Sequence, residues 1–145
     1  MQITGQITVT SPLERVLAIL AAVICLVVTI LFWWSVSALQ PMWPLPALYF
    51  IEMVTLSIIS AFSFLRGAPY AQFITWSAAG SISAFSILGA FSVGFFYLPV
   101  ALLFVLISII SDVRNKQNVV AHLGVFVIAG IVQAALMLVV IRLLY

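Results

Sequence analysis

The stretch GAFSVGFFYLP, residues 89–99, lies in the middle of an apolar run over residues 72–111. The run is 40 residues long. As one straight helix it would extend about 60 Å, twice the roughly 30 Å hydrocarbon core of a bilayer. Gly89 and Gly94 offer a permissive backbone, and Pro99 suits the first turn of a new helix. The run therefore predicts two membrane passes joined by a tight hairpin.

The composition indicates that lipid, rather than water, surrounds the chain. Of its 145 residues, 66% are hydrophobic and 6% are charged, and the mean hydropathy is +1.38. An ordinary soluble domain is about 25% charged and about 45–50% apolar. We therefore expect an all-α, polytopic helical integral membrane protein in a lipid bilayer. Five basic and three acidic residues are too few for a nucleic-acid surface, so no nucleic-acid partner is expected.

Apolar runs divide the chain into about five expected transmembrane helices. Three prolines in QPMWPLP, residues 40–46, exclude a helix interior, and LRGAP, residues 65–69, is a stop signal. The polar stretch SDVRNKQN, residues 111–118, precedes the last pass. The whole chain, residues 1–145, is expected to be one membrane domain. The expected passes cover residues 13–39, 47–65, 72–90, 96–111 and 119–144.

The basic residues predict an orientation. With five passes, the two loops on one side carry no basic residue, and four basic residues fall on the other side: Arg15, Arg66, Arg114 and Lys116. The positive-inside rule then predicts a multi-pass cell (inner) membrane protein with a cytoplasmic N-terminus and an outside C-terminus. Arg142 is the only basic residue against the trend. A re-entrant turn at residues 89–98 is the competing geometry, because backbone at membrane depth is tolerated where protein covers it.

Ser11, Pro12 and Glu14 predict the start of the first helix at the membrane edge. The serine suits the N-cap, the proline suits the first turn, and the acid complements the helix dipole.

Glu52 is the residue with the strongest functional claim, because an ionisable side chain within a membrane pass is a functional-site hypothesis by default. It lies about six residues into the second pass, roughly 8–9 Å along the helix. Thr55 lies on the same side of that helix, and Gln133 in the last pass is the candidate partner. We expect Glu52, Thr55 and Gln133 to be candidate proton- or ion-coupling residues. The alternative is that Glu52 only joins helices by a hydrogen bond.

Small residues four positions apart predict close helix packing in the third and last passes, because small side chains let two backbones approach each other. The expected packing residues are Ser77, Gly80, Ser81, Ala84, Gly130 and Ala134. The third pass is therefore expected to be a packing hub. The first pass is dominated by Ile, Leu and Val, and it is expected to face lipid or another apolar subunit.

The other reactive side chains form no catalytic or metal-ligating pattern. His122 and Cys25 lie on different passes without a ligand-spaced partner, so no metal ion and no cofactor are expected. Two copies of His122 could share an ion in a dimer, but a histidine at the cytoplasmic interface is the simpler interpretation. Asp112, Arg114 and Lys116 are expected to lie in a solvated loop near anionic headgroups.

The pattern favours a non-catalytic integral membrane subunit or scaffold that packs within a larger membrane assembly or a homo-oligomer. The alternative is a small secondary transporter or channel that acts as a homo-oligomer with Glu52 as the coupling acid. A membrane enzyme is disfavoured, because one histidine and three acids offer no catalytic constellation.

Overall fold

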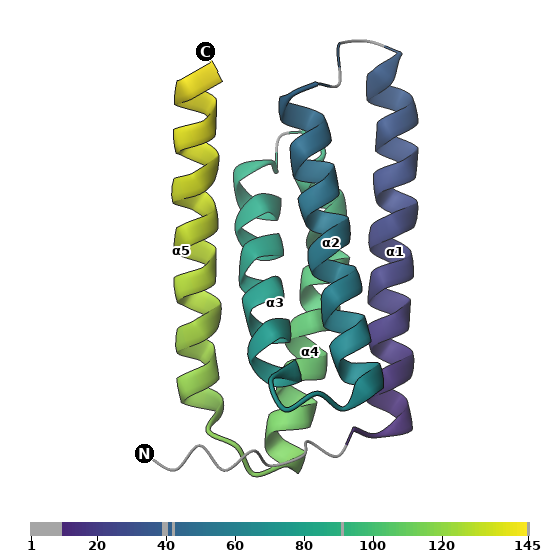
Figure 1. Ribbon diagram of the computed structural model, residues 1–145, viewed down its shortest axis with the longest axis vertical. Coiled ribbons are helices and arrows are strands. Elements are labelled where there is room, and N and C mark those ends of the chain that lie inside the picture. The colour runs from purple at the N-terminus through teal and green to yellow at the C-terminus, as the bar shows by residue number, and fades with distance from the viewer. Residues whose placement is uncertain (1–9, 39–40, 42, 91, 145) are drawn as a thin grey trace.

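The computed structural model describes residues 10–38, 41, 43–90 and 92–144, which form helices and no strand (Figure 1). The elements are α1 (Pro12–Ser37), α2 (Leu45–Arg66), α3 (Ala71–Leu88), the short 3-10 helix η1 (Gly94–Tyr97), α4 (Leu98–Arg114) and α5 (Val119–Leu144). Successive α-helices run in opposite directions along the long axis (Figure 1). The expected all-α class is confirmed.

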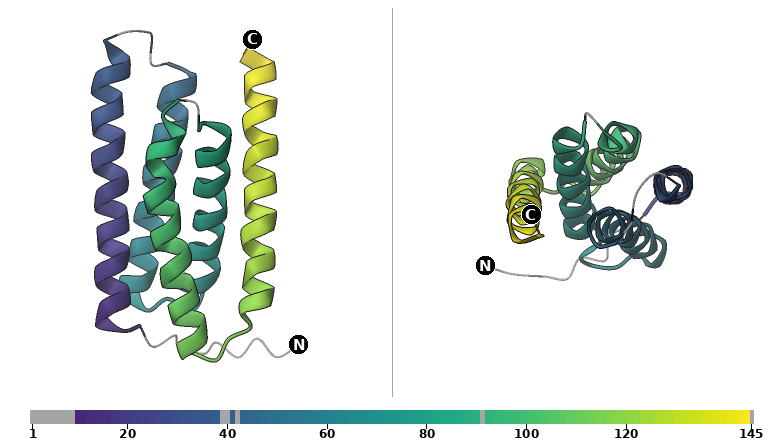
Figure 2. Two further views of the ribbon diagram at one scale, coloured as in Figure 1. Left: turned by 180° about the vertical axis from the view of Figure 1, so that it is seen from behind. Right: turned by 90° about the horizontal axis from the view of Figure 1, so that it is seen from above.

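Four of the described helical segments are long and apolar enough to cross a membrane. They are Pro12–Ser37, Leu45–Arg66, Gly94–Arg114 and Val119–Leu143. α3 is not among them, because its 18 residues include serine, threonine and glutamine. α3 packs against α2, α4 and α5, and the view from above places it in the middle of the assembly (Figure 2). A helix covered by protein on several sides does not need a lipid-compatible surface all around.

α1 begins as the sequence predicts. The Ser11 hydroxyl accepts a hydrogen bond from the Glu14 backbone N–H at 3.2 Å, and the Glu14 carboxylate accepts one from the Ser11 N–H at 3.1 Å. These two bonds form a capping box, with Pro12 in the first turn. The helix ends at Ser37, and Leu39, the expected end of the pass, lies outside the described residues.

The hairpin between α3 and α4 depends on a close backbone approach. The Gly94 N–H donates to the Gly89 carbonyl oxygen at 2.8 Å, and a Cβ on Gly94 would lie 2.6 Å from the Gly89 carbonyl carbon. Gly89 has an ordinary φ of −91°, so space, rather than a special backbone conformation, requires these glycines. Pro99 lies in the first turn of α4, as expected. Phe91, inside the expected turn, lies outside the described residues.

The α3–α4 hairpin ends short of the neighbouring helices (Figure 1). α3 has 18 residues, whereas α2 has 22 and α5 has 26, which correspond to lengths of about 27, 33 and 39 Å. The ends of α2 and α5 therefore extend beyond the hairpin.

α4 continues further than the sequence suggests. The expected pass ends at residue 111, but the helix ends at Arg114, and Asp112 is fully buried within it. The expectation that Asp112 lies in a solvated loop is therefore wrong. The Gln117 N–H donates to the Asp112 carbonyl oxygen at 2.9 Å, and the chain turns only after this bond.

The core lies among α1 to α4, and α5 lies at one edge against α3 (Figure 2). The largest fully buried side chains are Trp76, Tyr97, Phe50, Phe64 and Phe104. Much of the surface of α1 and α5 consists of exposed Leu, Ile and Val side chains. Such a surface suits a hydrocarbon solvent.

Four of the basic residues lie at one end of the molecule (Figure 1). Arg15 lies in the first turn of α1, Arg66 ends α2, and Arg114 and Lys116 lie at the end of α4 and just after it. Arg142 lies in the last turn of α5, at the opposite end.

Candidate functional site

Glu52 and Gln133 meet between α2 and α5. The Gln133 side-chain amide donates to the Glu52 carboxylate oxygen Oε2 at 3.0 Å. Gln133 is 5% exposed, and Glu52 is half-buried. The two side chains lie in the interior of their helices, so the bond joins α2 to α5 away from both helix ends.

Thr55 does not take part in this contact. Its hydroxyl donates to the carbonyl oxygen of Ile51 in the preceding turn of α2 at 2.7 Å, and its side chain is exposed. The structure therefore brings together Glu52 and Gln133 of the three candidate coupling residues, and leaves Thr55 on the surface of the helix.

A second contact joins α2 and α5 one turn away. The Tyr49 hydroxyl, three positions before Glu52, donates to the carbonyl oxygen of Met137, four positions after Gln133, at 3.4 Å. Tyr49 also packs against Phe85 of α3, with ring centroids 5.8 Å apart. The two contacts fix the spacing of α2 and α5 beside α3.

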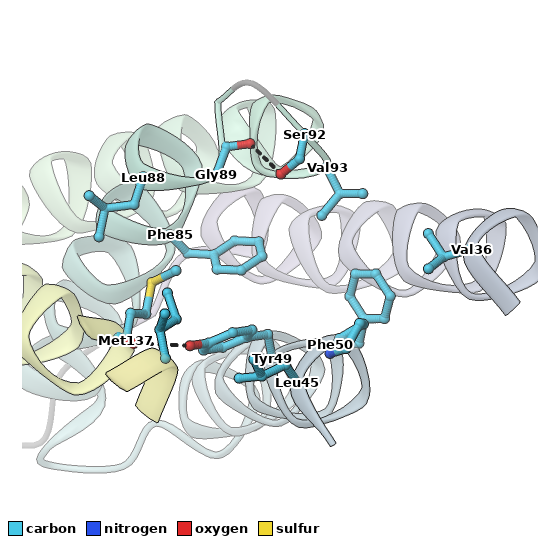
Figure 3. Close-up of a pocket in the computed structure, with 12 residues that line it drawn as sticks. Val36, Leu45, Tyr49, Phe50, Phe85, Leu88, Gly89, Ser92, Val93 and Met137 are labelled. Atoms are coloured by element: carbon cyan, nitrogen blue, oxygen red, sulfur yellow. Dashed lines mark hydrogen bonds between the residues drawn. The ribbon is translucent and has the colours of Figure 1, made fainter. Parts of the chain in front are cut away.

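A cavity of about 320 Å³ lies where α2 and α5 extend beyond the hairpin (Figure 3). We call it the aromatic cavity, because three rings line it: Tyr49, Phe50 and Phe85. Leu45, Met137 and Ile141 supply aliphatic wall, and Ser92 lies on the hairpin side with its hydroxyl bonded to the Gly89 carbonyl oxygen at 3.0 Å. Figure 3 shows the rings of Tyr49 and Phe85 facing the cavity from opposite helices. Its shape follows from the short α3–α4 hairpin.

A second hollow, of about 310 Å³, lies between α3 and α5. Ser77 and Ser81 line it from α3, and Ala129 and Gln133 line it from α5. Gln133 therefore contacts Glu52 and also borders this hollow. Ser77 and Ser81, which the sequence predicts as packing residues, border open space here.

α3 and α5 approach each other closely at Gly80. A Cβ at this position would clash with the backbone carbonyl of Phe126 in α5 and would lie 3.2 Å from the Ala129 Cβ. A Cβ on Gly130 would lie 3.3 Å from the Gly80 carbonyl oxygen and 3.9 Å from the Ala84 Cβ. Gly80, Ala84 and Gly130 thus lie at the α3–α5 contact, and Ala134 is half-buried one turn further along α5.

Asp112 is the centre of a buried polar cluster that the sequence analysis missed. Gln72 Nε2 donates to its Oδ1 at 2.5 Å, Trp76 Nε1 donates to its Oδ2 at 2.9 Å, and His122 Nδ1 lies 2.9 Å from both oxygens. Gln72 Nε2 also donates to the Ser108 carbonyl oxygen at 2.6 Å. The cluster joins α3, α4 and the start of α5.

Glu14 is the second fully buried acid. Its Oε2 accepts a hydrogen bond from Arg114 Nη2 at 2.8 Å, while the Arg114 side chain remains 33% exposed. This ion pair joins the start of α1 to the end of α4. Glu14 therefore caps its own helix and also binds a distant one, which sequence analysis of the capping pattern alone does not predict.

No three His, Cys, Asp or Glu side chains within the described ranges come together as a metal site. His122 is bonded to Asp112, and the Cys25 thiol is buried 3.5 Å from the Met53 carbonyl oxygen. The Thr29 and Tyr97 hydroxyls share a hydrogen bond of 2.7 Å between α1 and η1. These groups form contacts between helices.

Comparison with known proteins found no matching family model, no matching curated protein and no matching solved structure.

Proposed function

We propose that this chain is a non-catalytic integral membrane subunit or scaffold that packs within a larger membrane assembly or a homo-oligomer. One observation carries the proposal: each of the three carboxylates holds at least two helices together. Glu14 joins α1 to α4, Asp112 joins α4 to α3 and α5, and Glu52 joins α2 to α5. Polar contacts between helices support a structural role, because such contacts hold the helices of a membrane bundle together.

In this proposal the chain crosses the membrane five times. α3 crosses as the central helix, and the neighbouring helices cover much of its less apolar surface. The basic end of the bundle, with Arg15, Arg66, Arg114 and Lys116, faces the cytoplasm, so the N-terminus is cytoplasmic and the C-terminus is outside. The exposed apolar sides of α1 and α5 face lipid or neighbouring subunits.

Purification of the chain from its source membrane in a mild detergent, with mass spectrometry of the co-purifying proteins, tests the scaffold role. We expect stoichiometric membrane subunits or a defined homo-oligomer. A monomer without partners, in both detergent and nanodiscs, would contradict the proposal.

A small secondary transporter or channel that acts as a homo-oligomer, with Glu52 as the coupling acid, is the second candidate. It is favoured by the position of the Glu52–Gln133 bond, with the aromatic cavity one turn away on one side and the α3–α5 hollow at Gln133 itself. Acidic side chains within membrane-spanning helices are typical of ion and proton pathways.

A further inference from the structure

The α3–α5 hollow contains polar groups that lack a partner within the described part of the chain. The Ser77 and Ser81 hydroxyls line it from α3, and neither makes a hydrogen bond with a described residue. Thr75 and Ser86 of the same helix instead donate to the carbonyl oxygen one turn back, each at 2.8 Å. A hydroxyl that leaves water is costly without a hydrogen-bond partner, so the two serines favour an occupant that supplies one.

Gln133 adds an acceptor to the same hollow. Its side chain is 5% exposed, and its Nε2 donates to Glu52. Its Oε1 accepts no hydrogen bond from the described residues, and it is not among the polar atoms that protein encloses completely. The oxygen therefore remains accessible where Gln133 borders the hollow.

The two walls of the hollow differ in shape. Ser77 and Ser81 are small side chains four positions apart, so they leave a groove along α3. Ile128 and Val132, also four positions apart, form a ridge along α5, and they are 63% and 58% exposed. A two-fold axis along the membrane normal, in front of the hollow, places α5 of each copy opposite α3 of the other. The ridge of each copy then meets the groove of the other.

We propose that the α3–α5 hollow is the contact surface between two copies of this chain in a two-fold symmetric dimer. Ile128 and Val132 of each copy pack against Ser77 and Ser81 of the other, which brings the serine hydroxyls of one copy towards Gln133 of the other. This inference rests on the proposed scaffold role, because it names the partner through which the chain assembles.

The lining favours a second copy over two other occupants. A lipid acyl chain fits the apolar part of the hollow of about 310 Å³, but it offers no hydrogen bond to the hydroxyls or the amide oxygen. A foreign helix with a charged side chain would meet no opposite charge, because none of the described lining residues is charged. A second copy is neutral here and brings hydroxyls and amides, which both donate and accept. α5 also lies at the edge of the bundle, where a second copy can reach it (Figure 2).

Disulfide cross-linking between two differently tagged copies, co-expressed in one membrane, tests the geometry. One copy carries Ser81→Cys and the other carries Ile128→Cys, and the wild-type chain, with its buried Cys25, gives the background. We expect a cross-link between the two tagged chains. Val127→Cys in place of Ile128→Cys is the matched control. Val127 is exposed, but it lies about 100° around α5 from Ile128 and does not line the hollow, so it should cross-link little.

The strength of association is measured by energy transfer between labelled copies in liposomes as the lipid-to-protein ratio is raised. Ser81→Leu fills the groove, so it is expected to weaken dimerisation about tenfold or more. Ser77→Ala combined with Ser81→Ala keeps both side chains small and removes both hydroxyls, so it is expected to weaken dimerisation several-fold. Val127→Leu, outside the hollow, should dimerise like the wild type.

Two outcomes would overturn the dimer and leave the scaffold role standing. They are an oligomer that a folded Ser81→Leu variant leaves unchanged, and stoichiometric foreign subunits bound to a chain that does not associate with itself. A monomer without partners would overturn both proposals. If Ser81→Leu does not fold, the cross-linking still decides, because a Ser81→Cys and Ile128→Cys pair that reacts no faster than the Val127→Cys control contradicts the dimer.

Discussion

His122 Nδ1 lies 2.9 Å from both carboxylate oxygens of Asp112, so the first turn of α5 is bound to a buried acid near the end of α4. α5 otherwise packs mainly against α3. The contact therefore holds an edge helix to the bundle at the basic end, while the Glu52–Gln133 bond holds it near the middle.

Removal of the Asp112 carboxylate is expected to destabilise the bundle strongly. Asp112→Ala leaves Trp76 Nε1 and His122 Nδ1 buried or half-buried without their acceptor, so we expect a loss of about 3–5 kcal/mol in the free energy of unfolding. Asp112→Asn keeps one acceptor oxygen and should lose less. The measurement is denaturant unfolding in detergent micelles. Val113→Ala, at an exposed neighbouring position, should change the free energy by less than about 0.5 kcal/mol. Equal losses in the alanine and control variants would refute the role of the cluster.

A methyl group at Gly80 is expected to push α5 away from α3. Gly80→Ala would place its Cβ against the Phe126 backbone carbonyl, which cannot rotate away, so we expect a loss of about 1–3 kcal/mol. Gly124→Ala in α5 is the matched control, because its Cβ would meet no atom within 4 Å and alanine favours helix. Thermal unfolding of both variants in the same detergent makes the comparison. A Gly80→Ala protein as stable as Gly124→Ala would show that the two helices are not packed this closely.

The Glu14–Arg114 pair predicts a particular order of stabilities. Arg114→Met leaves the fully buried Glu14 carboxylate without its cation, so it should be the least stable variant. Glu14→Gln, combined with Arg114→Met, removes the unpaired charge and keeps an oxygen for the helix cap. The double variant should therefore unfold at a higher temperature than Arg114→Met alone. The opposite order would mean that the pair contributes no net coupling.

The lengths of the apolar runs and the turn residues between them made most of the fold predictable from the sequence. The prolines of residues 40–46, the glycines of the hairpin and the capping serine at residue 11 each act on the local backbone, so their effects follow from sequence alone. The same local reasoning failed for Asp112. Its neighbours Arg114 and Lys116 indicate a loop, but its burial depends on Trp76 and Gln72, which lie 36 and 40 positions away.

The candidate site, like the fold, could be predicted from the sequence only in part. Gln133 could be named as the partner of Glu52, because both are polar residues inside apolar helices. Thr55 lies on the same side of α2 as Glu52, but its hydroxyl bonds a backbone carbonyl oxygen within α2. A hydroxyl on the Cβ of a helical residue commonly bonds the carbonyl oxygen one turn back. The aromatic cavity was not predictable, because it arises from the different lengths of α2, α5 and the hairpin.

If Glu52 couples transport, Glu52→Gln should abolish substrate-driven or proton flux in proteoliposomes. The variant keeps the shape of the side chain and a hydrogen bond to Gln133, so insertion and oligomer size should be preserved. Thr55→Val, whose side chain lies outside the contact, should transport like the wild type. Unchanged flux in Glu52→Gln would exclude the coupling mechanism and would leave the scaffold role.

The five-pass topology predicts that the two ends of α4 are reached from opposite sides of the membrane. Ser92 is exposed at the α3–α4 hairpin, and Asn118 is exposed just before α5, at the basic end of the bundle. The native Cys25 is fully buried, so the wild-type chain should react little with a membrane-impermeant maleimide and provides the background. Ser92→Cys should be labelled in intact cells, whereas Asn118→Cys should be labelled only after the membrane is opened. Labelling of both in intact cells, or of neither, would favour a re-entrant hairpin, because a hairpin that returns to its own side leaves both positions facing one compartment.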